Sequence, residues 1–135
     1  MKAGRVSLSI VSLAVRVLLV FAMIGGCASV PSSPPTPITN MSQIEGRWRG
    51  TITRGFAGPQ EFYEITIHPD GSFVAQYGMN WQWGKVTLGD GVASFEVTAP
   101  GTSTGSLKYY AGPGKRSLTM DSTFGNWSVQ ATAVN

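Results

Sequence analysis

From Gly46 to the end of the chain, short runs of alternating apolar and polar residues follow one another, and turn-forming residues separate them. The runs are rich in Thr, Val, Ile, Tyr, Phe and Trp, whereas Gly, Pro, Asp and Asn fill the breaks. A period of two is typical of strands that bury one face, and no stretch here has the longer period of an amphipathic helix. The pattern predicts eight strands, over 46–54, 60–68, 72–78, 81–88, 92–98, 102–110, 116–122 and 127–134.

Two of the breaks contain an Asp-Gly pair, in Pro69-Asp70-Gly71 and in Gly89-Asp90-Gly91. Such a pair joins neighbouring antiparallel strands through a tight turn, because glycine readily adopts a positive φ. Eight short strands joined in this way predict an all-β domain, a small antiparallel up-and-down barrel. A β-sandwich built from the same strands is the alternative.

The alternation also assigns each strand residue to a face of the sheet. We expect side chains to fill the interior, because an eight-stranded barrel has room only for side chains or for one small ligand. The predicted inward-facing residues are Trp48, Ile52, Tyr63, Ile65, Ile67, Phe73, Tyr77, Val86, Leu88, Phe95, Val97, Leu107, Leu118, Met120, Trp127 and Val129. The predicted outward-facing residues are Arg47, Arg49, Thr51, Thr53, Glu64, Thr66, Lys85, Thr87, Glu96, Lys108, Thr119 and Asp121.

The first 26 residues have the three parts of a secretory signal peptide. Lys2 and Arg5 form a basic start, residues 17–24 form an apolar run, and Gly25-Gly26 are small residues before Cys27. The apolar run is too short for a transmembrane helix, which needs roughly 20 apolar residues. We therefore predict a signal peptide over residues 1–26.

Ile24-Gly25-Gly26-Cys27 resembles the lipobox of bacterial lipoproteins. The resemblance implies cleavage before Cys27 and lipidation of that cysteine, the only one in the chain. Acyl chains on one residue would hold the protein stably at a membrane. In that family the residue after the lipidated cysteine helps to sort the protein between the inner and outer membranes. Ala28 at this position favours the outer membrane in a host that has two membranes. The alternatives are an ordinary secretory signal with an incidental cysteine, or an anchor that is never cut.

Residues 31–37 hold four of the eight prolines and cannot pack a core. Such a segment is typically extended and acts as a spacer. We assign residues 27–43 to the lipidated cysteine and a Pro/Ser-rich linker, and residues 44–135 to the barrel domain. We expect the folded part to begin near Ile38 to Ile44.

The charge balance argues against a nucleic-acid partner. The 135 residues carry a formal net charge of +3, but Lys2, Arg5 and Arg16 belong to the predicted leader. The remainder holds seven basic and seven acidic residues. Affinity for a phosphate backbone rests on clustered positive charge, and no such excess remains.

Gly46-Arg47-Trp48, at the start of the first predicted strand, is similar to the Gly-x-Trp signature of lipocalins and, more loosely, of avidin-like barrels. In those families the tryptophan closes one end of the barrel, so the resemblance implies this barrel-closing role for Gly46 and Trp48. The chain departs from lipocalins because it has no Thr-Asp-Tyr motif and no disulfide pair. A shared fold does not by itself transfer a function.

Few residues could carry chemistry. His68 is the only histidine, and no Gly-x-Ser-x-Gly element presents a nucleophilic serine. His68 and Asp70 lack the further ligands that a zinc site needs. The scattered carboxylates leave open a spatial pair of the glycosidase type. We predict no enzyme activity, no cofactor and no metal.

The segment Met79-Asn80-Trp81-Gln82-Trp83 stands out because Met79, Trp81 and Trp83 share the strand face opposite to Val86. Exposed tryptophans are typical of binding surfaces. We take these three residues as the predicted ligand or partner surface. A bulge near Gly84 would instead turn both tryptophans into the core. Arg116, in a turn, is expected to be ordinary solubilising charge.

Three functions fit these features. The first is a lipid-anchored, non-enzymatic binding module of the cell envelope that takes a small hydrophobic ligand. The second is an inhibitor or assembly partner of an envelope protein, acting through loops such as 54–59 and 100–102. The third is a passive structural role. An open apolar cavity would favour the first, and a filled core with prominent loops would favour the second.

Overall fold

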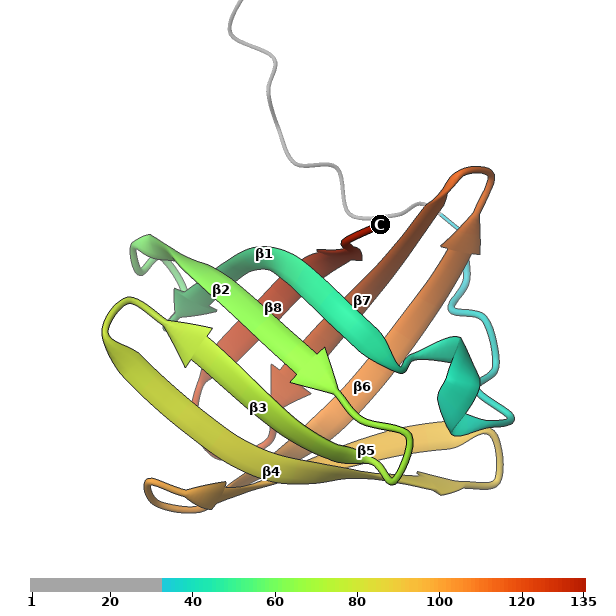
Figure 1. The fold of residues 1–135 in the computed structure, drawn as a ribbon. Helices are drawn as coiled ribbons and strands as arrows, with labels where there is room; N and C mark the ends of the chain where they lie inside the picture. Colours follow the sequence, from blue (N-terminus) through green and yellow to red (C-terminus); the bar gives the residue numbers. More distant parts are fainter. Residues whose placement is uncertain (1–32) are drawn as a thin grey trace, which may run out of the picture. The chain divides into compact units, whose positions relative to one another are not determined.

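A computed structural model describes residues 33–135 of the chain (Figure 1). The predicted signal peptide and Cys27 lie outside the described residues. Residues 33–135 form a 3-10 helix and eight strands: η2 (Met41–Gln43), β1 (Gly46–Arg54), β2 (Gln60–Ile67), β3 (Ser72–Tyr77), β4 (Asn80–Gly89), β5 (Val92–Ala99), β6 (Ser103–Gly112), β7 (Lys115–Ser122) and β8 (Trp127–Ala133).

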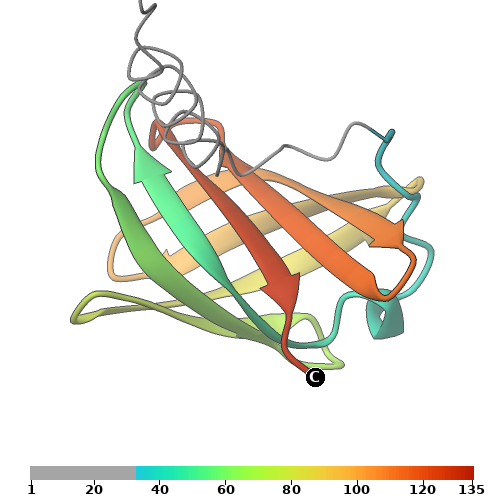
Figure 2. The same ribbon diagram turned by 90° about the horizontal axis from the view of Figure 1, so that it is seen from above.

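The strands form a closed antiparallel barrel in which each strand pairs with the next, and β8 pairs with β1. Figure 2 shows β8 running beside β1 where the barrel closes. The eight-stranded up-and-down barrel is therefore confirmed, and the sandwich alternative is wrong. Every strand boundary lies within two residues of its predicted position.

The inward-facing side chains pack as one hydrophobic cluster. All sixteen predicted inward residues belong to it or pack against it, with Leu88 and Trp127 only partly buried. Thr119 has the predicted outward direction, but it is buried rather than exposed. Its register partners are Lys108 and Gln130, so Thr119 still has outward parity. The position of a residue in the strand alternation determines the direction of its side chain, but the neighbouring structure determines how exposed that side chain is.

Glycines make room for the large rings inside the barrel. Phe73 pairs with Gly84 across β3 and β4, and Phe95 pairs with Gly105 across β5 and β6. A Cβ atom on either glycine would clash with its partner ring and with a neighbouring backbone carbonyl. An aromatic ring lying over a glycine of the adjacent strand compensates for the missing side chain.

The chain before β1 closes one end of the barrel. The Thr36 amide donates a hydrogen bond to the Tyr109 carbonyl at 2.7 Å, and Thr36 Oγ1 accepts one from the Ala111 amide at 3.1 Å. Thr36 therefore pairs with β6 in an isolated bridge. Ile38 and Ile44, which flank η2, are buried in the core. We call this end, with η2 and the turns β2–β3, β4–β5 and β6–β7, the plugged end.

The other end carries four loops, over residues 55–59, 78–79, 100–102 and 123–126. We call these loops the rim. They connect β1 to β2, β3 to β4, β5 to β6 and β7 to β8, and they lie on the left in Figure 1, opposite η2. The meander therefore separates the connections into two groups, one at each end of the barrel.

Candidate functional site

Three rim loops each present one large apolar side chain to solvent. Phe56 is fully exposed, Met79 is 95% exposed and Phe124 is 86% exposed. Gly55 and Gly78, which precede two of these residues, have φ values of 70° and 55°. Such turns interrupt the alternation of inward and outward residues along a strand. A side chain at the tip of the turn is therefore not directed into the barrel core.

The rim contains no charged residue, although 13% of the chain is charged. The plugged end differs, because its turns include Asp70 and Asp90 and its last hairpin continues into Lys115-Arg116. Large exposed apolar groups on an uncharged surface are unusual for a soluble domain and mark interaction sites. The rim is therefore the surface with the strongest signature of binding.

Trp81 and Trp83 lie on the outer face of β4, and they are 48% and 47% exposed. The pairing of β4 with β5 does shift near Gly84, where Trp83 faces Ala99 and Gly84 faces Val97. The extra residue, Thr98, belongs to β5, and its hydroxyl donates a hydrogen bond to the Trp83 carbonyl at 3.2 Å. The bulge thus leaves the alternation of β4 intact. Both tryptophans remain outside, on the flank next to Met79.

Phe62 adds a further exposed ring to the outer face of β2. Sequence reasoning identified Met79, Trp81 and Trp83 but did not single out Phe56, Phe62 or Phe124. A phenylalanine next to turn glycines has no strand neighbour to shield it, as at Gly55-Phe56 and Phe124-Gly125. That local signal could have identified the two rim phenylalanines.

Polar groups line the barrel below the rim. The Arg54 guanidinium lies 4.6 Å from the centroid of the Tyr77 ring, and Tyr77 stacks on Tyr63 with centroids 6.4 Å apart. Burial, with a smaller contribution from Tyr77, raises the pKa of the Tyr63 hydroxyl. This hydroxyl and Gln82 Oε1 are buried without a hydrogen-bond partner among residues 33–135. Tyr63 is therefore a neutral phenol with unused hydrogen-bonding capacity, not a base.

At the plugged end, Trp48 is completely buried and its Nε1 donates a hydrogen bond to the Ile44 carbonyl at 2.8 Å. Its ring meets Tyr109 edge-on at 6.4 Å. The guanidinium of Arg116, an exposed residue, lies 5.4 Å from a Trp48 ring centroid, a contact that the prediction of a solubilising charge did not include. Gly46 begins β1 with a φ of 113°, a conformation that favours glycine.

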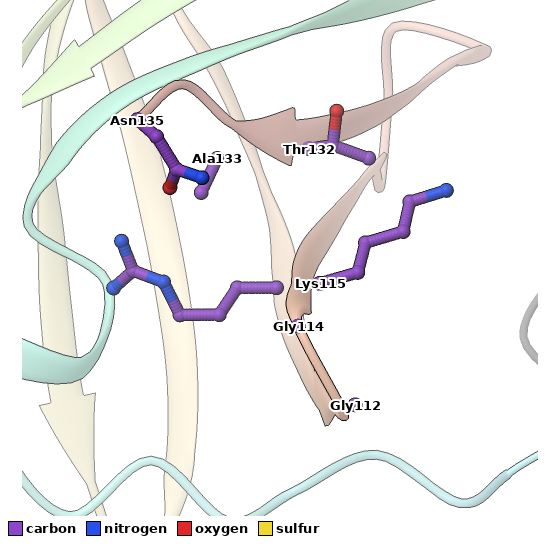
Figure 3. Close-up of a pocket in the computed structure, with 7 residues that line it drawn as sticks. Gly112, Gly114, Lys115, Thr132, Ala133 and Asn135 are labelled. Atoms are coloured by element: carbon purple, nitrogen blue, oxygen red, sulfur yellow. The ribbon is translucent and has the colours of Figure 1, made fainter.

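A pocket of about 390 Å³ lies beside the β6–β7 hairpin and the end of β8. Figure 3 shows Lys115 pointing away from Ala133 and Asn135. Small-molecule sites are usually lined by apolar and aromatic groups. This pocket is lined by Gly112, Gly114, Lys115, Arg116, Thr132, Ala133 and Asn135, so its lining does not fit that description.

His68 is exposed next to the β2–β3 turn, where its amide donates a hydrogen bond to the Ser72 carbonyl at 2.8 Å. Asp70 Oδ1 accepts hydrogen bonds from the Ser72 hydroxyl at 2.6 Å and the Ser72 amide at 2.9 Å, and they lower the pKa of Asp70. These groups hold a hairpin turn. Within residues 33–135, no three His, Cys, Asp or Glu side chains cluster in a way that could hold a metal ion.

No protein-family model, curated protein sequence or solved structure shows significant similarity to this chain. Within the described part of the chain, no helix is long and apolar enough to cross a bilayer.

Proposed function

We propose that this protein is a non-enzymatic binding module of the cell envelope, anchored through a lipid on Cys27, that works through its rim. The observation that carries the proposal is the set of three solvent-exposed apolar side chains, Phe56, Met79 and Phe124, on three of the four uncharged rim loops. In a host with two membranes, the lipobox resemblance and Ala28 favour the outer membrane.

Surface binding explains the barrel better than transport of a small ligand in its interior. The twenty buried apolar residues form one packed cluster, and residues of the N-terminal segment seal the plugged end. A rigid, well-packed barrel is a suitable scaffold for loops that carry function. The lipocalin resemblance then supports the architecture alone, and we propose no lipocalin-like cargo.

A protein partner is the second candidate, and one observation favours it. The loops over 54–59 and 100–102, which an inhibitor would use, lie at the rim of a filled barrel. Aromatic residues and methionine are also enriched in protein interfaces. In this version the barrel presents Phe56 and its neighbours to a pocket on an envelope protein.

Anchoring is tested by replacing the single cysteine. We expect Cys27→Ser to abolish lipidation and leave either an uncut precursor or a soluble form, read from the intact mass and from fractionation. Unchanged membrane attachment and unchanged mass in this variant would rule out the lipid anchor.

Rim function is tested by Phe56→Ser, Met79→Ser and Phe124→Ser combined in one full-length variant. Val92→Ser is the matched control, because Val92 is also exposed and apolar but lies at the plugged end. After gentle purification from native membranes, we expect the rim variant to lose the associated material that wild type and control retain. Equal recovery from all three proteins would contradict a binding role for the rim and leave the structural role.

A further inference from the structure

We propose that the rim docks on a lipid bilayer, with Phe56, Met79 and Phe124 inserted at the boundary between headgroups and acyl chains. This inference rests on the proposed function and names the partner of the same surface. It assigns a second, non-covalent membrane contact to a protein whose first contact is the predicted lipid anchor.

The arrangement of the apolar groups fits a bilayer better than a protein groove. Each side chain belongs to a different loop, and all three are almost fully exposed. Protein hot spots usually lie in packed clusters surrounded by contacts that exclude water. Isolated apolar side chains can each enter the acyl region of a bilayer, which adapts its shape to them.

The charge distribution supports the same partner. Bringing a charged side chain into the bilayer is costly, and none of the four rim loops carries one. Arg54, the cation nearest the β1–β2 loop in sequence, lies over the Tyr77 ring. Charged residues thus begin on the strands next to the rim, where Arg54 ends β1 and Glu61 lies near the start of β2.

Next to the apolar loop tips, the outer face of the barrel carries two tryptophans. Trp81 and Trp83 follow Met79 on the outward face of β4, and both are about half exposed. Tryptophan is enriched at membrane interfaces because it combines a large apolar ring with an N–H group that can reach water or headgroups. The order from the tip is therefore apolar side chains first and tryptophans next.

The lipid anchor and the rim can reach the same membrane. Thr36 is fixed near the plugged end by its bridge to Tyr109. The nine residues from Cys27 to Thr36 can span about 28 Å if extended. A nine-residue strand tilted by about 40° covers roughly 23 Å along the barrel axis. The linker is thus long enough to run back past the barrel, and two membrane contacts together would hold the module more firmly than one.

Photo-crosslinking in the native envelope tests the proposal. The photoreactive amino acid p-benzoylphenylalanine replaces Phe56 in one full-length protein and Val92 in the control. We expect the peptide that contains position 56 to gain the mass of a phospholipid, and the control peptide to gain none. Lipid adducts of equal yield at both positions would overturn docking by the rim.

The same experiment separates this inference from the proposed function. A discrete protein adduct at position 56 alone would overturn the lipid partner and leave a binding role for the rim. Absence of any adduct at position 56 would overturn both. The aromatic replacement at a fully exposed position keeps the fold, which a melting curve verifies.

Vesicles provide the quantitative test. Full mature protein is reconstituted in vesicles of phosphatidylethanolamine and phosphatidylglycerol that contain a brominated lipid. Quenching of tryptophan fluorescence reports docking, because Trp81 and Trp83 are exposed next to the rim. We expect Phe56→Ser to lower the docking equilibrium constant about tenfold, because a side chain of this size no longer enters the acyl region. Val92→Ser should leave quenching unchanged. Equal quenching in wild type and Phe56→Ser would overturn the proposal.

Discussion

Glycines at inward positions control how closely the strands of this barrel approach one another. Gly84 lies beneath the Phe73 ring and against the Glu96 carbonyl, and neither neighbour leaves space for a methyl group. Gly105 has the equivalent relation to the Phe95 ring. Gly89, in the same strand as Gly84, has open space where a Cβ would lie and no unusual φ. Substitutions at these three positions therefore distinguish the effect of core packing on stability from the effect of the backbone freedom of glycine.

We expect Gly84→Ala and Gly105→Ala each to lower the free energy of unfolding by about 1–3 kcal/mol, because the added methyl overpacks the core. Gly89→Ala should leave stability unchanged or raise it by up to about 1 kcal/mol, since alanine restricts the unfolded chain. Urea unfolding at pH 7 measures all three. A loss in Gly89→Ala as large as in Gly84→Ala would contradict the packing explanation.

The tryptophans differ in their contribution to stability, because Trp48 faces the barrel interior and Trp81 and Trp83 face outward. Trp48 is buried against Ile44 and the Tyr109 ring, whereas Trp81 and Trp83 lie on the outer face of β4. We expect Trp48→Ala to cost about 3–5 kcal/mol of unfolding free energy. Changing Trp81 and Trp83 together to Ser should cost less than about 1 kcal/mol, as is usual for surface positions. Denaturant unfolding distinguishes them, and a large loss in the double variant would show that β4 packs its tryptophans.

A pair of arginines on β1 holds one carboxylate of β2. Glu64 accepts a hydrogen bond from Arg49 Nε at 2.6 Å and from Arg47 Nε at 2.8 Å. These bonds lower the pKa of Glu64 below its usual value. A carboxylate whose pKa is lower in the folded state adds stability above its unfolded pKa of about 4.3, and this stability is lost as the pH falls through the folded value.

We therefore expect Glu64→Gln to lower unfolding free energy at pH 7 by about 0.2–1 kcal/mol, the usual range for exposed ion pairs. The difference from wild type should shrink toward zero as the pH is lowered far enough to protonate Glu64 in the folded protein. Asp70 titrates in both proteins, so its effect cancels. An equal difference at pH 7 and at that lower pH would rule out the charge of Glu64 as the cause.

The sequence pattern was sufficient to predict the eight strands, because the alternation of apolar and polar residues and the Asp-Gly turns are local signals. It placed Trp48 and Phe95 correctly inside, and all strands lie close to their predicted bounds. It could not decide the fate of Trp81 and Trp83, since the bulge near Gly84 could have been in either strand. The extra residue is Thr98 on the partner strand, and only pairing in space shows this.

The whole barrel has two dissimilar ends, and sequence reasoning did not foresee that difference. Arg116 lies over Trp48 at the plugged end, whereas Phe56 and Phe124 stand free at the rim. Which turns share an end follows from the meander, but the gathering of the apolar tips becomes visible only when alternate loops are compared. Under the proposed function, this asymmetry is a division of roles between the two ends. The plugged end stabilises the fold, and the rim binds.

Reactivity of single cysteines in the native envelope tests this division most directly. Met79→Cys places a thiol on the rim, and Val92→Cys places one at the plugged end, in the same full-length background. In purified detergent-solubilised protein, both positions should react with a maleimide at similar rates, because both side chains are exposed. In intact envelopes we expect position 79 to react about tenfold more slowly than position 92, as for a rim occupied about nine-tenths of the time. Equal rates at the two positions in the envelope would contradict the claim that the rim is the working surface.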